Sequence, residues 1–168
     1  PTWVWFLLVG AVFGVSSAGS LFQQMDEIPP LLRASWRLQI TTLMLTPLMI
    51  WQWKNANQEI KTRFVERKNL GLLLLSGVAL ALHFAFWVSS LDHTSLAHSL
   101  LFVTAHPLVI ICGIAIFIRR PSKYEILGAV LGLSGAAITL LDIKDGGEVT
   151  LLGDTLAFLG AITVVGYI

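Results

Sequence analysis

Four histidines stand in one apolar stretch of the sequence, "LALHFAFWVSSLDHTSLAHSLLFVTAHPL" at residues 80–108. An imidazole can bind a polar solute, carry a proton or ligate a metal ion. A polar side chain in so apolar a segment costs free energy unless a partner or a ligand satisfies it, so these residues are candidates for function. Which of them lie at membrane depth depends on the helices that position them.

Helical spacing sorts these side chains onto shared faces. His83 and Trp87 are one turn apart, and His83 is expected either to line a solute cavity or to donate to a backbone carbonyl across a helix contact. His98 and His106 share a face with Phe102 between them, and for this pair we favour cavity lining. The stretch therefore predicts two antiparallel helices that help to wall a solute path.

The remaining features of the stretch concern its turn and its proline. His93 follows Asp92 in a short turn, where a solvated residue is the better interpretation. His106 precedes Pro107, which lacks a backbone N–H and frees a carbonyl near Val103 for a solute, a water or a side chain. No metal site is predicted, because no Cys or carboxylate stands at ligand spacing at depth.

Two further groups of polar residues are candidates. Ser17 and Ser20 belong to "SSAGS" near the end of the first apolar segment. Such serines either bond to their own helix backbone or form a hydroxyl wall, which here would face His83 and His106. Arg37 near the hydrophobic boundary is expected to snorkel or to pair structurally, and the alternative role is a vestibule charge that orients an anionic group.

Composition places the chain in the class of membrane proteins. It is 55% hydrophobic and only 12% charged, which is too apolar for a soluble domain of this length. The 11 Lys and Arg nearly balance the 10 Asp and Glu, so the sequence does not predict a nucleic-acid partner. The single cysteine, Cys112, excludes a disulfide framework within the chain.

Apolar segments of roughly 20 residues, the length that crosses a bilayer as a helix, predict six spans. We therefore expect an all-α, polytopic transmembrane helical bundle whose first partner is the lipid bilayer. The six segments are residues 3–22, 34–53, 69–91, 93–118, 124–141 and 151–168.

The distribution of basic residues predicts the orientation, because cytoplasmic loops are enriched in Lys and Arg. Connections after the second and fourth spans carry eight such residues, against three on the other side. The N-terminus is therefore expected in the cytoplasm, in a plasma or inner membrane or else an organelle membrane. The eight are Lys54, Lys61, Arg63, Arg67, Lys68, Arg119, Arg120 and Lys123; the three are Arg33, Arg37 and Lys144.

Small residues four apart predict close helix packing in the first and fifth spans. "FLLVGAVFGV" at 6–15 also resembles "LAFLGAITVV" at 156–165, and the five spans between force the second copy to cross in the opposite direction. This arrangement is typical of inverted-repeat transporters. The small residues are Gly10, Gly14 and Ala18 in the first span and Gly128, Gly132 and Ala136 in the fifth.

The order and spacing of four segments resemble EamA-type members of the drug/metabolite transporter superfamily over nearly the whole chain. The resemblance implies ten helices in two inverted five-helix repeats around a central solute path. Residues 1–142 would be the first repeat, and 143–168 an outer loop with the first helix of a second repeat. We expect the natural protein to continue by about four helices, or partner membrane subunits to complete the bundle. The segments are "PPLLRASWR" at 29–37, the stretch at 80–108, "RRPSKYEILGAVLGLSGAAITLL" at 119–141 and "GDTLAFLGAITVVGY" at 153–167.

The leading functional prediction is secondary transport of a small metabolite by alternating access, without covalent chemistry or a cofactor. No span carries a Lys or Arg at depth to offset a buried phosphate, so a neutral or zwitterionic, amino-acid-like solute is expected. The alternative is a non-transporting structural or accessory subunit of a larger membrane complex. An enzyme is not predicted, since no carboxylate pair, nucleophile elbow or metal motif occurs. The candidate solute-binding residues are His83, Trp87, His98, Phe102, His106, Ser17 and Ser20.

Overall fold

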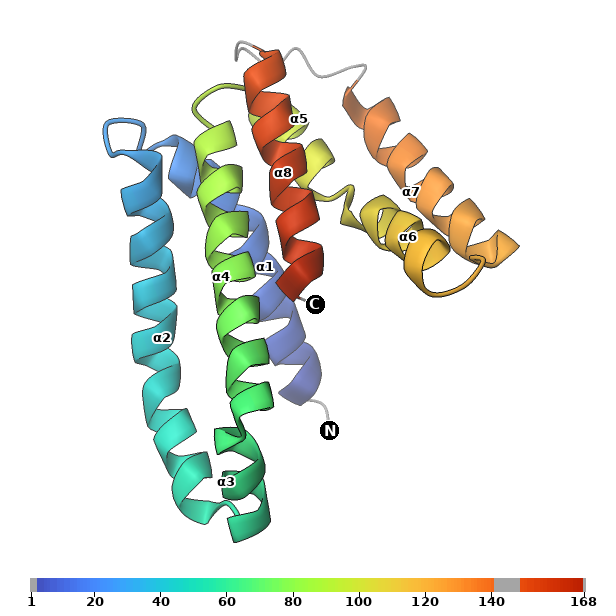
Figure 1. The fold of residues 1–168 in the computed structure, drawn as a ribbon. Helices are drawn as coiled ribbons and strands as arrows, with labels where there is room; N and C mark the ends of the chain where they lie inside the picture. Colours follow the sequence, from blue (N-terminus) through green and yellow to red (C-terminus); the bar gives the residue numbers. More distant parts are fainter. Residues whose placement is uncertain (1–2, 141–148, 168) are drawn as a thin grey trace.

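The computed structural model describes residues 3–140 and 149–167, which form eight α-helices and their connections (Figure 1). The predicted all-α class is confirmed. The side chain of Ala136, the whole of Lys144 and the predicted boundary at 142–143 lie outside what the structure describes. The helices are α1 (Trp3–Gln23), α2 (Pro30–Asn55), α3 (Gln58–Val65), α4 (Arg67–Ser90), α5 (Leu96–Val103), α6 (His106–Phe117), α7 (Lys123–Leu140) and α8 (Leu151–Tyr167).

Length, apolarity and the distribution of side chains identify an integral membrane protein. α1, α4 and the stretch Leu96–Phe117 are long and apolar enough to cross a bilayer. Large apolar side chains point outward: Phe6 is 80% exposed and Leu74 is 72% exposed. Small and polar side chains occupy buried positions, since Ser99 and Ala157 are each 0% exposed. This distribution suits a helical bundle surrounded by lipid.

The predicted fourth span is not one continuous helix. It begins at Leu96 and is interrupted at Thr104 and Ala105, so that α5 and α6 are separate helices. Pro107 explains the break, because it lacks the N–H that would bond to the Val103 carbonyl four residues earlier. A side chain approaches this carbonyl in the structure: Nδ1 of His106 lies 3.4 Å from the Val103 oxygen.

α4 is the centre of the bundle, with α2 and α8 packed beside it, and α8 also contacts α5 and α6 (Figure 1). The end of α1 and the start of α8 lie at the same end of the bundle, so these two helices run in opposite directions (Figure 1). We call the opposite end, which carries residues 54–68, the basic end (Figure 1). In the connection between α6 and α7, Arg119 donates to the Glu125 carboxylate at 2.6 Å, and this hydrogen bond raises the pKa of Arg119.

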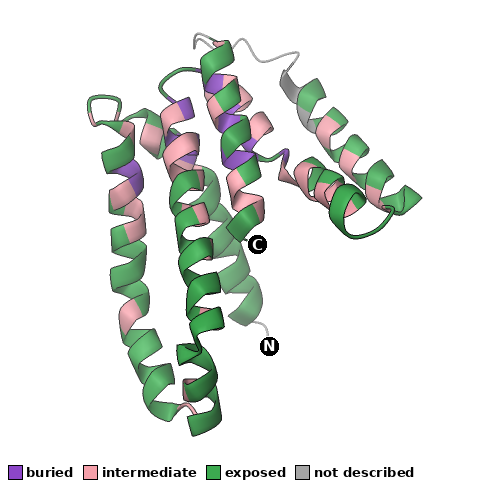
Figure 2. Cartoon of the chain, in the orientation of Figure 1, coloured by how far each residue is buried: buried purple, intermediate pink, exposed green. Residues whose placement is uncertain are grey.

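The glycines predicted to pack closely in α1 and α7 do not do so, although Ala18 of α1 packs against the buried cluster that includes Trp87. A Cβ added to Gly10, Gly14, Gly128 or Gly132 would have nothing within 4 Å. α8 instead presents its small residues to its neighbours, and these are buried in the half of the bundle away from the basic end (Figure 2). Lacking bulk, they let the backbone of α8 approach α4 closely. They are Gly153, Ala157, Gly160 and Ala161.

Candidate functional site

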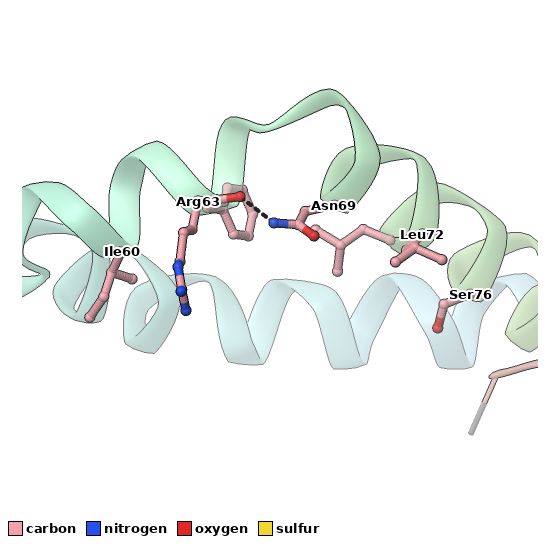
Figure 3. Close-up of a pocket in the computed structure, with 7 residues that line it drawn as sticks. Ile60, Arg63, Asn69, Leu72 and Ser76 are labelled. Carbon is pink, nitrogen blue, oxygen red and sulfur yellow. Dashed lines mark hydrogen bonds between the residues drawn. The ribbon is translucent and has the colours of Figure 1, made fainter.

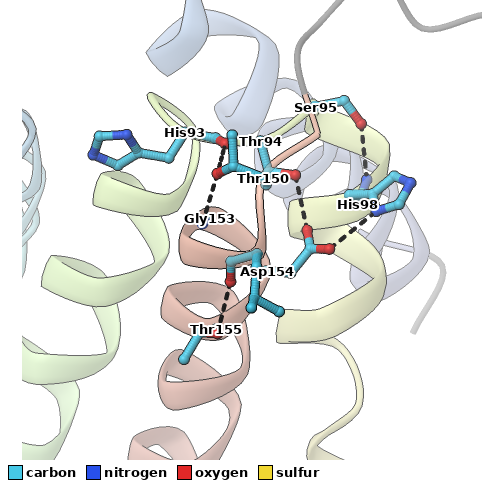
Figure 4. A network of polar contacts seen from close by, with 9 residues as sticks. His93, Thr94, Ser95, His98, Thr150, Gly153, Asp154 and Thr155 are labelled. Carbon is cyan, nitrogen blue, oxygen red and sulfur yellow. Dashed lines mark hydrogen bonds and ion pairs between the residues drawn. The ribbon is translucent and has the colours of Figure 1, made fainter.

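A polar cluster joins the turn between α4 and α5 to the first turn of α8 (Figure 4). The Thr94 hydroxyl donates to Oδ1 of Asp154 at 2.8 Å, and Nδ1 of His98 lies 3.4 Å from Oδ2 of the same carboxylate. Ser95 caps α5 by accepting from the backbone N–H of His98 at 3.3 Å. One carboxylate of α8 thus bridges the turn and α5, and its place near a helix N-terminus favours its negative charge.

The start of α8 is also held on this turn through its backbone. The Thr150 hydroxyl donates to the His93 carbonyl and accepts from the N–H of Gly153 at 3.1 Å. Gly153 allows this approach, because a Cβ there would lie only 2.5 Å from Cβ of Thr94 and 2.6 Å from the carbonyl carbon of His93. The cluster therefore fixes where α8 enters the bundle.

Two buried serines continue the polar contacts between α4 and α5. Ser90 donates to the Trp87 carbonyl at 2.6 Å, and the hydroxyls of Ser90 and Ser99 lie 2.6 Å apart. Because the Ser90 hydroxyl already donates its one hydrogen to the Trp87 carbonyl, the Ser99 hydroxyl is the donor in the hydrogen bond between the two serines. Both serines are fully buried, so these bonds remove the cost of placing hydroxyls inside the bundle.

His83 lies where α4 meets α8. Its Nδ1 is 2.9 Å from the Gly160 carbonyl, which can only accept, so this nitrogen carries the proton. The imidazole stacks on Trp87 with ring centroids 6.4 Å apart and an angle of 13° between the planes. His83 is expected from the sequence either to line a solute cavity or to donate to a backbone carbonyl across a helix contact. The structure contains the second of these, a hydrogen bond from α4 to α8.

The other candidate residues divide into two groups. His98 and Phe102 lie together on α5 with ring centroids 6.5 Å apart, and His98 reaches α8 through Asp154. His83 reaches α8 through Gly160, so that helix connects the two groups. Outside them, His106 turns to the Val103 carbonyl, Ser17 donates to the Gly14 carbonyl of its own helix at 3.2 Å, and Ser20 is exposed.

Sequence reasoning missed a buried ion pair at this end of the bundle. Arg33, only 1% exposed, pairs with Asp92 and donates to the Phe22 carbonyl at 2.6 Å. It ties the start of α2 to the last turn of α1 and to the turn that follows α4. The available signal was the position of Arg33, three residues after Pro30 and four before Arg37, which predicts a helix start with two cations on one face.

Arg37 is held by aromatic rings instead of a carboxylate. The centre of its guanidinium lies 4.6 Å from the ring centroid of Phe84, 5.6 Å from that of Trp87 and 5.7 Å from that of Phe22. These cation–π contacts stabilise the charge. Nη1 of Arg37 and Nε1 of Trp87 are buried, and neither has a hydrogen-bond acceptor within residues 3–140 and 149–167.

Three surface grooves are lined by residues other than the seven candidates. The largest, about 580 Å³, lies between α6 and α7 and includes Gly128 and Gly132. A second of about 510 Å³ lies where α3 meets α4 at the basic end, and there Asn69 donates to the Arg63 carbonyl at 2.5 Å (Figure 3). Within the described residues, no three His, Cys, Asp or Glu side chains are grouped to hold a metal ion.

Comparison with known proteins identifies the family. The model of the EamA-like transporter family matches residues 2–141, most of the chain. Neither the curated proteins nor the solved structures gave a match. This match agrees with the helical bundle and its apolar outer surface, since all three indicate a membrane protein. The chain belongs to the EamA-like transporter family of membrane transporters.

Proposed function

We propose that this chain forms part of the solute path of a secondary transporter that moves a small neutral or zwitterionic, amino-acid-like metabolite by alternating access. In this proposal residues 1–142 are the first five-helix repeat, and α8 is the first helix of an inverted second repeat. A following segment of about four helices, or partner membrane subunits, completes the wall. The basic end faces the cytoplasm.

The contact between α4 and α8 is the observation that carries the proposal. α4 contributes an imidazole and an indole, His83 and Trp87, and α8 contributes a backbone carbonyl and a face of small residues. Small side chains leave a smooth surface along which two helices can shift relative to one another. A shift of α8 would break the bond between His83 and the Gly160 carbonyl and free both groups for a solute.

The chemistry of the candidate residues supports the solute class. Imidazoles, hydroxyls and aromatic rings suit a solute with a few hydrogen-bonding groups and an apolar part. Arg33 is already neutralised by Asp92, which leaves Arg37 as the cation on this part of α2 that no described carboxylate pairs with. A single guanidinium matches one carboxylate better than a phosphate dianion, whose burial requires more positive charge.

Uptake of labelled solutes into liposomes that contain the natural protein tests this function. We expect amino acids to be transported, and we expect His83→Ala and His106→Ala to reduce the rate. His93→Ala is the matched control, because His93 is exposed on the turn and should leave uptake unchanged.

Three results would contradict the proposal in different ways. Transport of sugar phosphates but not of amino acids would refute the solute class. If uptake is unchanged in both His83→Ala and His106→Ala, the two histidines do not bind the solute and serve only in helix packing. Failure of the folded natural protein to move any solute would support the accessory subunit instead.

A further inference from the structure

Two side chains in contact, those of Arg37 and Trp87, each carry a buried N–H donor without an acceptor in the described chain. The Arg37 guanidinium is centred 5.6 Å from the Trp87 ring, and Nη1 of the one and Nε1 of the other are both closed off from solvent. Trp87 as a whole is 7% exposed. Buried donors in native proteins nearly always find an acceptor, so a pair of orphaned donors at one place indicates a missing partner.

We propose that Nη1 of Arg37 and Nε1 of Trp87 bind the carboxylate of the transported solute; this rests on the amino-acid-like solute proposed above. The guanidinium presents its donors in a planar fork that matches a carboxylate, and the indole N–H adds a donor beside it. The sequence predicts Arg37 at the hydrophobic boundary, where it either snorkels or pairs structurally or else orients an anionic group.

The surroundings of the two donors favour an external carboxylate over one from the described chain. Asp92 is engaged by Arg33, and Asp154 is engaged by Thr94 and His98. The faces of Phe22 and Phe84 hold the Arg37 cation in place without supplying an acceptor. A preorganised cation with free donors is what recognition of an anionic group requires.

The same rings define the rest of the ligand. A carboxylate at the guanidinium would place the adjacent part of the solute among Phe84, Trp87 and His83, whose rings lie 5.0–6.4 Å apart. Aromatic faces accept an apolar or aromatic side chain and a cationic ammonium group. The site thus fits the two charges and the apolar part of a zwitterionic amino acid.

In the structure this site is closed. Arg33, one turn before Arg37 on α2, links that helix to Asp92 and to the Phe22 carbonyl. These links hold α2, α4 and the end of α1 together around the two orphaned donors. Both donor atoms are closed off from solvent, so a solute would reach them when these elements separate, which is the motion that alternating access supplies.

Transport assays with Trp87→Phe and Arg37→Lys test the proposal in the natural protein. Trp87→Phe keeps an aromatic ring for packing but removes the N–H, and Arg37→Lys keeps the charge but removes the planar fork. We expect each variant to raise KM for a labelled neutral amino acid at least about tenfold, the effect of losing one hydrogen bond to a charged group. KM for the carboxamide of the same amino acid should rise by a smaller factor, because its oxygen still accepts a hydrogen bond but carries no negative charge.

Trp5→Phe is the matched control, because Trp5 is 69% exposed on the outer face of α1 and should change neither KM. Binding of the labelled amino acid to detergent-solubilised protein, with monodispersity checked for each variant, separates lost affinity from misfolding. If the parent transports amino acids and both variants retain its KM, this assignment is wrong while the proposed function stands. If the folded parent neither binds nor transports amino acids, both fail.

Discussion

Replacing Gly153 by Ala tests whether α8 is held on the turn between α4 and α5. The added Cβ would lie 2.5 Å from Cβ of Thr94, 2.6 Å from the carbonyl carbon of His93 and 2.7 Å from its oxygen. Two of these neighbours are backbone atoms, so no side-chain rotation can relieve the contact. α8 must move away from the turn, or the turn must deform.

The expected loss of stability is about 2 kcal/mol. Overpacking of this kind costs about 1–3 kcal/mol. Displacement of α8 would also weaken the hydrogen bond from Thr94 to Asp154 and the bond from Gly153 to Thr150, at about 1 kcal/mol each. Ala has a higher helix propensity than Gly, which offsets at most about 1 kcal/mol of this loss of stability.

Gly160→Ala on the same helix is the matched control. Its Cβ would meet Val103 at 3.4 Å and the backbone of His83 and Trp87 at 3.5 Å, which is ordinary contact. We therefore expect its stability to stay within about 1 kcal/mol of the parent.

The assay is thermal unfolding of the natural protein in detergent. A loss of about 1 kcal/mol lowers Tm by about 2–4 °C in a chain of 150–250 residues, so Gly153→Ala should lower it by several degrees. Equal Tm values for the two Ala variants would refute the reasoning, because they would show that the start of α8 is free of the turn.

Two further predictions concern the ends of the bundle. A cysteine at Asn57 should react with an impermeant thiol reagent only from the cytoplasmic side and one at His93 only from the other; the reverse labelling would overturn the proposed orientation. Arg33→Gln should lower stability by about 2 kcal/mol, since it leaves Asp92 and the Phe22 carbonyl without their donor while the Asp92 side chain keeps 25% exposure to solvent. If the losses from Arg33→Gln and Asp92→Asn simply add in the double variant, as measured by thermal unfolding, the ion pair contributes nothing.

The helices that span the membrane could be predicted from sequence because their signals are local. Length and apolarity placed α1 within one residue of its observed end and α4 within two residues of its observed start. The same reasoning does not predict α3, because its eight residues stand in a charged connection between two spans and lack the length and apolarity of a span. It identified the carbonyl near Val103 that Pro107 frees, but it did not predict that the helix would be interrupted at Thr104 and Ala105.

The contacts of the candidate site were less predictable because they join distant parts of the chain. His83 and Gly160 are 77 positions apart, and Thr94 and Asp154 are 60 apart. Spacing within one helix shows which side chains share a face, but not which helix covers that face. The small residues illustrate this: Gly10, Gly14, Gly128 and Gly132 repeat as regularly as those of α8, yet an added Cβ on them would have nothing within 4 Å. Gly160 of α8 instead meets α4 and α5.

Arg33 and Arg37 show how far the outcome depends on distant residues. They stand one turn apart on α2, and no local rule separates them. Arg33 meets a carboxylate 59 positions along the chain and becomes a structural tie. Arg37 meets only aromatic faces, which stabilise its charge but accept none of its N–H groups in the usual hydrogen-bonding plane. Nη1 of Arg37 is closed off from solvent and requires an acceptor from elsewhere, and this requirement makes Arg37 the better candidate for binding a solute and Arg33 the better candidate for holding the helices together.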